Sequence, residues 1–183
     1  MLENKLGITD STELARAEEK ISKQKAIEMF ENGFLEKLEP GTYESLAAIH
    51  KYLFDGIYDF AGKLRKVNLS KGSFRFAPLM YLEAALQSID KMPQSTFDEI
   101  IEKYVEMNVA HPFREGNGRV GRLIMFKECL KYNIVPFIIE DNLKLFYYRG
   151  LKEWDNEKGY LTDTCLTAQD KYKAYLDYFR IVY

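Results

Sequence analysis

Apolar residues recur at helical spacing along almost the whole chain, and this periodicity constrains the fold more than any other feature of the sequence. Leu46, Ile49 and Leu53, for example, share one face of a helix, and that face has to be buried against a neighbouring element. The periodicity is interrupted once, in residues 64–77, where apolar and polar residues alternate on both sides of a Ser-Lys-Gly-Ser stretch. Alternation around turn residues is typical of a β-hairpin. The sequence therefore predicts an all-α fold that carries one short hairpin.

Capping signals divide the helical part of the chain into segments. Thr42 follows a Pro-Gly turn, Pro78 suits the start of a helix, and Thr96 with Glu99 has the spacing of a capping box. We therefore expect helices over 12–25 with a continuation to 34, after Thr42, after Pro78, from 97 to 111, from 120 to 130, near 141–153 and near 163–180.

The composition indicates one soluble globular domain over residues 1–183, because 46% of the 183 residues are apolar and 30% are charged. Lys and Arg total 26 against 28 Asp and Glu, a net charge of −2 that offers no attraction to a nucleic-acid backbone or an anionic membrane. No signal peptide and no apolar run of about 20 residues is present. We expect a cytoplasmic protein with no nucleic-acid and no membrane partner. Cys129 and Cys165 lack metal or disulfide spacing and are expected to be buried thiols.

Residues 111–122, His-Pro-Phe-Arg-Glu-Gly-Asn-Gly-Arg-Val-Gly-Arg, lie between the two most apolar helices and carry the chemistry. Pro112 disfavours continuation of the preceding helix, and the glycines permit a sharp loop. The backbone N–H groups of residues 116–119 should then point outward at a helix N-terminus, which is a ready anion site. Arg119 and Arg122 are three residues apart and could reach two successive phosphates.

His111 and Glu115 add a base and a metal ligand to this loop. His111 titrates near neutrality and could take a proton from a hydroxyl group. Glu115 offers the hard oxygen ligand that a Mg²⁺ ion between phosphates requires. Base, metal ligand, anion site and two cations are the parts of an enzyme that moves a phosphate-bearing group. The residues alone leave open which phosphorus is attacked.

Plainer interpretations compete with this one. A lone histidine at a helix end is more often a cap or core residue than a catalyst, and Asn-Gly by itself usually marks a hairpin turn. His111 and Glu115 also have the i, i+4 spacing of a metal pair on a helix. However, both flanks have helical periodicity, Pro112 and Gly116 argue against a helix there, and no second histidine lies nearby to complete a zinc site. His50, inside another helix, is interpreted as structural.

The loop matches every fixed position of the pattern His-x-Phe-x-(Asp/Glu)-Gly-Asn-Gly-Arg-x-x-Arg, and on these residues the chain resembles the Fic (filamentation induced by cAMP) family. The resemblance extends to the helical character of the chain and to a hairpin upstream of the loop. Asn4-Lys5-Leu6-Gly7-Ile8 is also similar to the start of members that are regulated by a separate antitoxin. The resemblance implies a protein adenylyltransferase (an AMPylation enzyme) that transfers AMP from ATP, with Mg²⁺, to a Ser, Thr or Tyr hydroxyl of a target protein.

The resemblance also implies catalytic and metal-binding roles. His111 would deprotonate the target hydroxyl, and Phe113 would anchor the loop in the core. Arg119 would act in catalysis by binding the β-phosphate. Glu115 would hold Mg²⁺ on the α- and β-phosphates.

Nucleotide-binding roles follow in the same way. Gly116, Asn117 and Gly118 would form the anion site, with Asn117 also contacting the α-phosphate. Arg122 would fix the γ-phosphate. The remaining implied contacts are peripheral: Lys71 at the hairpin tip could reach the nucleotide, and the adenine would lie against the helix after residue 139, where the candidates are Lys144 and Tyr147.

The hairpin of residues 64–77 resembles the segment that the family uses to bind its target, and we call it the flap. It would hold the target in extended form by main-chain pairing, through Phe74, Arg75 and Phe76. Strand addition suits this task because it positions a hydroxyl without demanding much sequence.

An inhibitory motif found in many family members is missing. These members silence themselves with (Ser/Thr)-x-x-x-Glu-(Gly/Asn), whose glutamate pairs with the second arginine of the loop. The partial matches that begin at Thr9 and Ser95 fail at the last position, and the segment 164–183 has no glutamate. Arg122 is therefore expected to have no partner within this chain, and a separate small antitoxin is expected to supply the glutamate.

Other functions are compatible with the fold that the resemblance implies. A kinase-like relative would transfer the γ-phosphate, another member could use a different phosphate-linked donor, and an idle member would serve only as a binding module. Kinase-like relatives depart from Gly-Asn-Gly, and idle members usually lose the histidine or an arginine. This sequence keeps all of them, which favours AMP transfer.

Overall fold

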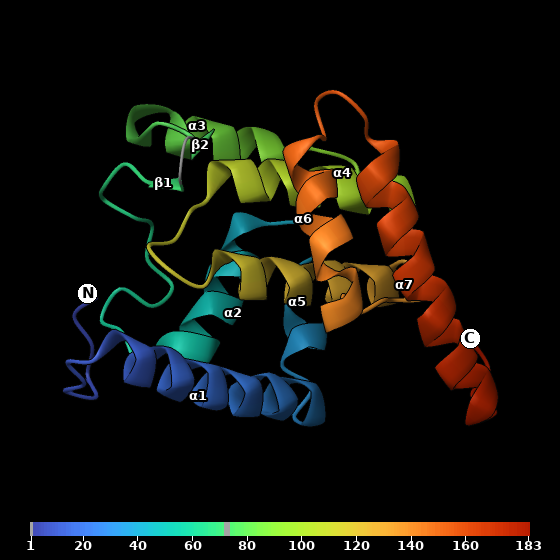
Figure 1. Ribbon diagram of the computed structural model, residues 1–183, viewed down its shortest axis with the longest axis horizontal. Helices are drawn as coiled ribbons and strands as arrows, with labels where there is room; N and C mark the ends of the chain where they lie inside the picture. The colour runs from blue at the N-terminus through green and yellow to red at the C-terminus, as the bar shows by residue number, and fades with distance from the viewer. Residues whose placement is uncertain (1, 72–73) are drawn as a thin grey trace. The chain divides into compact units, whose positions relative to one another are not determined.

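The computed structural model describes residues 2–71 and 74–183, and within them the fold is all-α with one hairpin, as predicted (Figure 1). The α-helices are α1 (Ser11–Glu31), α2 (Tyr43–Phe54), α3 (Leu79–Asp90), α4 (Phe97–Ala110), α5 (Asn117–Lys131), α6 (Lys144–Lys152) and α7 (Gly159–Tyr178). Short 3-10 helices, η1 (Leu35–Lys37) and η2 (Asp141–Leu143), precede α2 and α6. No helix in the described part of the chain is both long and apolar enough to cross a membrane.

The chain forms two compact units that share helices α4 and α5. The first unit is Met1–Met92 with Glu106–Ile124, and the second is Pro93–Val105 with Met125–Tyr183. Each unit has its own apolar core. The largest side chains of the first core include Phe54 and Phe113, and those of the second include Tyr147 and Leu161. The expectation of a single domain over residues 1–183 stays a prediction.

The predicted caps are present where the sequence placed them. Thr42 Oγ1 accepts a hydrogen bond of 3.2 Å from the Ser45 N–H at the start of α2. Thr96 and Glu99 form a reciprocal capping box at the start of α4. The Glu99 N–H donates to Thr96 Oγ1 over 3.3 Å, and the Thr96 N–H donates to Glu99 Oε2 over 3.1 Å. These side chains satisfy N–H groups that a helix start leaves unpaired, which fixes where each helix begins.

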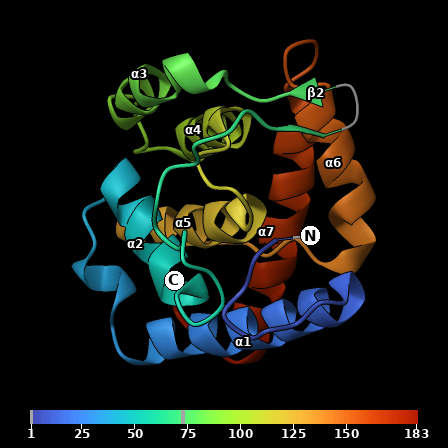
Figure 2. The ribbon, with the colours of Figure 1, turned by 90° about the vertical axis from the view of Figure 1, so that its left-hand side faces the viewer.

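Helix α1 is one continuous helix that ends at Glu31, so the predicted continuation to residue 34 was too long. Gly33 follows with a φ of 66°, a left-handed conformation that ends the helix. The buried residues of α1 are Leu14, Glu18, Ser22 and Met29, and two of them, Glu18 and Ser22, are polar. Helix α1 packs against α2 (Figure 2). Glu18 and Ser22 are buried in the first unit.

The hairpin is shorter than the sequence predicted. Strand β1 (Ser70–Lys71) pairs antiparallel with β2 (Phe74–Arg75), with Ser70 opposite Arg75. The predicted turn residues Gly72 and Ser73 lie outside the described residues, as does the side chain of Phe74. Next to these strands, the Phe76 N–H donates to the Leu69 carbonyl over 3.2 Å, and the other described residues of 64–77 are not in strand.

Helices α6 and α7 pack against each other within the second unit, and α7 begins four residues before the predicted start near 163. Gly150 of α6 lies so close to α7 that a Cβ there would be 2.6 Å from the Leu161 Cα, so a glycine is needed at this contact. Cys129 and Cys165 are buried in this unit, as predicted, and burial raises the pKa of each thiol to about 12.

Candidate active site

Residues 111–116 connect the end of α4 to the start of α5 in the first unit, and residues 117–122 of the predicted loop form the first turns of α5 (Figure 2). Helix α4 ends at Ala110, as Pro112 predicted, and His111 then turns with a φ of 50°. The Phe113 side chain is fully buried and stacks on His50, with ring centroids 3.9 Å apart. Phe113 therefore anchors the loop in the core, as the sequence implied.

His50 packs against the loop and has a structural role, as interpreted from the sequence. Its Nδ1 accepts a hydrogen bond of 2.8 Å from the Gly62 N–H. Nε2 must then carry the proton, which it donates to the Glu115 carbonyl over 3.0 Å. Burial lowers the pKa of His50 to about 4, so the ring is neutral and both hydrogen bonds persist at neutral pH.

The side chain of Asn117 closes the loop and does not project from it. Its Oδ1 accepts from the Phe113 N–H at 2.9 Å, and its Nδ2 donates to the Phe113 carbonyl at 2.8 Å. Its Oδ1 and one of its two Nδ2 N–H groups are therefore used within the loop, and the expected side-chain contact with an α-phosphate stays a prediction. A phosphate could still meet the main-chain N–H of Asn117.

The anion site is narrower than the predicted span of residues 116–119. The Gly116 N–H donates to the Glu115 carboxylate over 2.9 Å, and the Arg119 N–H donates to the Gly116 carbonyl over 3.1 Å. The N–H groups of Asn117 and Gly118 have no hydrogen-bond partner in the described part of the chain. They lie at the N-terminus of α5, where the helix dipole favours an anion.

The His111 ring lies flat against Phe76 of the flap, with ring centroids 3.7 Å apart and an interplanar angle of 17°. Its Nδ1 is 3.3 Å from the Asn108 carbonyl, which can only accept, so Nδ1 carries the proton. Nε2 is then left with a lone pair, as a general base requires. Desolvation is the main reason that the pKa of His111 is lowered to about 4, and the charges of Arg65 and Lys71 contribute to this lowering.

Arg119 points toward helix α1. Its guanidinium forms an ion pair with Glu18, donates to Ser22 Oγ over 3.1 Å, and lies 4.9 Å from the centre of the Phe54 ring. Burial, and then the nearby charge of Arg122, lower its pKa to about 10, so it stays charged at neutral pH. Glu18 is itself buried and also accepts a hydrogen bond from the Tyr58 hydroxyl.

Arg122 lies beside the first turn of α5. A Cβ on Gly118 would be 3.3 Å from its Nη1, so the guanidinium lies over the stretch that carries the unpaired N–H groups. Arg122 forms no ion pair with any described carboxylate. Lys71, on strand β1, is exposed and near enough for its charge to act on His111. The first unit thus brings together the loop, both arginines, the base and the flap.

Glu115 is the one loop residue that suits a metal ion. Its side chain is 47% exposed, and one carboxylate oxygen lies 3.9 Å from the Arg119 guanidinium. In residues 2–71 and 74–183, no group of three or more His, Cys, Asp or Glu could hold a metal by itself. A single exposed carboxylate fits a Mg²⁺ ion that keeps its waters and takes its other ligands from substrate phosphates.

Comparison with known proteins agrees with this geometry. Residues 40–129, which include the flap and the loop, match the model of the Fic/DOC family. A protein of Sinorhizobium fredii named "Probable protein adenylyltransferase y4lH" is 30% identical over 72% of this chain and 71% of its own length. The chain belongs to the Fic/DOC family.

Two further relatives extend the comparison. The Salmonella typhimurium protein named "Probable protein adenylyltransferase Fic" is 32% identical over 67% of this chain, and the match spans 64% of that protein. The crystal structure of BepC from Bartonella tribocorum with bound AMPPNP has a TM-score of 0.71 and 18% identity, over 92% of this chain and 91% of that one. The structural likeness shows that this chain has the Fic fold.

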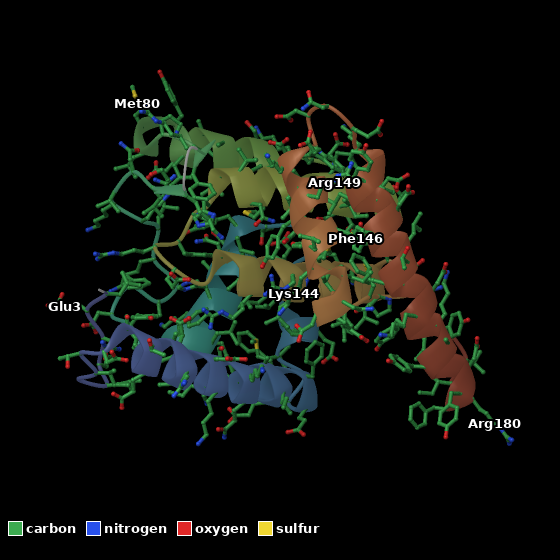
Figure 3. The ribbon with its side chains drawn as sticks, viewed as in Figure 1. Glu3, Met80, Lys144, Phe146, Arg149 and Arg180 are labelled. Carbon is green, nitrogen blue, oxygen red and sulfur yellow. The ribbon has the colours of Figure 1, made fainter. Side chains whose placement is uncertain are left out.

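The two adenine candidates lie in the second unit of this Fic/DOC protein, on helix α6, where Figure 3 labels Lys144. Lys144 is half-exposed and forms an ion pair of 2.6 Å with Asp141. Tyr147 is buried, with its ring near those of Tyr104 and Tyr148, at centroid distances of 6.3 and 5.5 Å. It offers an adenine no exposed face, so its placement does not support the expectation.

Sequence reasoning missed Glu18, the partner of Arg119, and Arg65, which is 3% exposed and contacts the loop. Glu18 had a detectable signal, because it lies with Leu14 on the one helix face that is buried. Arg65 had none, since it sits between Lys63 and Lys66 in a stretch with an ordinary solvated composition.

Proposed function

We propose that this chain is a protein adenylyltransferase that transfers AMP from ATP to a hydroxyl side chain of a target protein. The observation that carries the proposal is His111, which is neutral at pH 7 with Nε2 unprotonated, on the loop that also presents two unpaired N–H groups and Arg122. The names of the Salmonella and Sinorhizobium relatives, and the AMPPNP in BepC, support the same chemistry.

In this reaction the target hydroxyl oxygen attacks the α-phosphorus, the bond to the β-phosphate oxygen breaks, and pyrophosphate leaves. The hydroxyl proton passes to His111 Nε2. The N–H groups of Asn117 and Gly118 stabilise the negative charge of the phosphates. Arg119 would bind the β-phosphate with N–H donors that its contacts to Glu18 and Ser22 leave over, and Arg122 would bind the γ-phosphate. Mg²⁺, held by Glu115, would neutralise charge on the phosphates when bound.

The flap is the proposed target-binding element. Its strands are short and its Arg75 side chain is exposed, so an extended target segment can pair with main-chain groups at its edge. Phe76 packs on His111, which would bring a hydroxyl that is bound along the flap close to the base. Lys71, on the same hairpin, would face the nucleotide.

Label transfer to bacterial lysate proteins tests the proposal. The purified chain is incubated with ATP labelled at the α- or the γ-phosphate, with Mg²⁺ or with EDTA, beside a His111→Ala control. We expect label only from the α-phosphate, only with Mg²⁺, and none with the control. Label from the γ-phosphate alone would make the protein a kinase, and no label from either position would contradict AMP transfer.

We further propose that a separate protein inhibits this site by supplying a carboxylate to Arg122. The motivating observation is that Arg122 has no acidic partner in the described residues, whereas Arg119 has one. Expression of the chain alone in bacteria should therefore impair growth, and His111→Ala should relieve the impairment. Normal growth of bacteria that express an enzyme active in the lysate assay would contradict the proposed inhibition by a separate protein.

A further inference from the structure

We propose that Arg65 is a positioning residue that fixes the catalytic loop and the flap relative to each other. This inference rests on the proposed function, in which His111 is the base and the flap holds the target. Arg65 lies in the segment between α2 and β1, and its side chain is turned into the first unit with 3% of its surface exposed.

The guanidinium of Arg65 bridges two segments of the chain. On the loop side, Nε donates to the His111 carbonyl at 2.8 Å, and Nη2 donates to the Ala110 carbonyl at 3.2 Å. On the flap side, Nη1 donates to the Val67 carbonyl at 2.7 Å, and Nη2 also donates to the Ala77 carbonyl. Four of the five N–H donors of an arginine are therefore used, two on each segment.

The acceptors explain how a buried charge is tolerated here. No described carboxylate pairs with Arg65, and desolvation lowers the pKa of its guanidinium. Two of its acceptors belong to the end of helix α4, where unpaired carbonyls and the helix dipole stabilise a positive charge. A planar guanidinium can satisfy several carbonyls at fixed angles, whereas an ammonium group is a single point of charge.

The loop contacts matter because His111 has a φ of 50°, a conformation that side-chain-bearing residues rarely adopt. Such a conformation persists only where its surroundings hold it. The Arg65 side chain holds the His111 carbonyl, and the Arg65 main-chain N–H donates to the Pro112 carbonyl at 2.9 Å. Arg65 thus fixes the peptide groups on both sides of the turn that aims the imidazole.

The contacts of Arg65 with the flap fix the segment that packs on the His111 ring. Val67 and Ala77 stand at the two ends of the hairpin base, and the Ala77 N–H also donates to the Val109 carbonyl at 3.1 Å. Ala77 directly follows Phe76, which stacks on His111. By holding both ends of the hairpin, Arg65 sets the distance between the target-binding edge of the flap and the His111 ring.

The test is Arg65→Lys, which keeps the charge and the aliphatic stem but loses the planar fork. We expect kcat for AMP transfer to fall about 100-fold, because a misplacement of about 1 Å at a reacting group has an effect of that size. The KM for ATP should change less than about two-fold, since Arg65 contacts no group of the anion site. Arg16→Lys, the same change at an exposed arginine on α1, is the matched control and should alter neither value.

A spectroscopic measurement separates positioning from a general structural role. The chain has two histidines, so His111→Ala assigns their ring resonances. In Arg65→Lys the His111 resonance should move as its stacking on Phe76 loosens, whereas the His50 resonance should not. Exchange of the Ala77 amide hydrogen should become about ten-fold faster, because a hydrogen bond at the flap base opens more often.

The outcomes are distinct. Unchanged kcat with an unmoved His111 resonance would overturn the inference. A loss of ATP affinity as large as the loss of kcat, with movement of both histidine resonances, would also overturn it. If the wild-type chain transfers no AMP, the proposed function fails while the resonances still decide the role of Arg65. If Arg65→Lys does not fold, the wild-type Arg65 Nε–H signal decides: slow exchange with water supports the bridge, and fast exchange contradicts it.

Discussion

His111→Ala should reduce the rate of AMP transfer about 1,000-fold at pH 7, within the range that a positioned general base contributes. The ring is held on one face by Phe76 and at Nδ1 by the Asn108 carbonyl, so its Nε2 is the atom that can accept the hydroxyl proton. Alanine removes that acceptor and leaves the N–H groups of Asn117 and Gly118 in place.

Two measurements on this variant decide the role of the ring. Label transfer gives the rate, and titration calorimetry with ATP gives the dissociation constant, which should stay within about two-fold of the wild-type value because the anion site is intact. A variant that unfolds would contradict a catalytic role for His111 and make the ring structural.

The pH dependence of the wild-type rate follows from the same ring. Burial, before any other cause, lowers the pKa of His111 to about 4. The neutral form is the base, so the rate should be flat between about pH 6 and 8 and should fall as the pH drops through about 4. A rate that halves near pH 6.5, the ordinary pKa of histidine, would contradict this placement.

Stability must be followed over the same range of pH. His50 and His111 both have a pKa of about 4 in the folded chain and an ordinary value near 6.5 when unfolded. The unfolded chain therefore binds more protons between these values, so the free energy of unfolding falls as the pH decreases from 6.5 toward 4. Circular dichroism at each pH separates loss of the base from loss of the fold.

The helical fold was predictable because its signals are local. Thr96 and Glu99 are three residues apart, and this spacing ahead of an apolar face favours the capping box that they form. The flap was predicted too long for a reason that is not local. The main-chain N–H of Arg65 donates to the Pro112 carbonyl, so it pairs with a distant segment and not with an opposite strand.

The site was predictable in its residue types but only partly in its contacts. His111, Glu115 and Arg122 could be named from one stretch of sequence, since the loop brings them together by itself. The partner of Arg119 could not be named, because Glu18 is 101 residues away in the chain and only the packing of α1 brings it there. The hydrogen bonds between the Asn117 amide and Phe113 were not predicted either, because they depend on how the loop turns between these two residues.

Glu18→Ala should lower the free energy of unfolding by about 3 kcal/mol, which is the effect of removing one partner from a buried ion pair. The Glu18 side chain is 9% exposed and serves both Arg119 and the Tyr58 hydroxyl. Its loss removes the buried counter-charge of a partly buried guanidinium and leaves only the exposed Glu115 carboxylate, 3.9 Å away. The adjacent Glu19 pairs with Lys23, but both side chains are more than 60% exposed, so Glu19→Ala should change stability by less than about 0.5 kcal/mol.

Urea unfolding of both variants measures the difference, and a double variant tests its cause. If the loss in Glu18→Ala comes from an uncompensated charge, then Glu18→Ala combined with Arg119→Met should recover part of it, because no buried charge remains. A double variant that is less stable than Glu18→Ala would show that packing of the Arg119 side chain on Phe54 dominates instead. Equal losses in Glu18→Ala and Glu19→Ala would contradict a buried ion pair between Glu18 and Arg119.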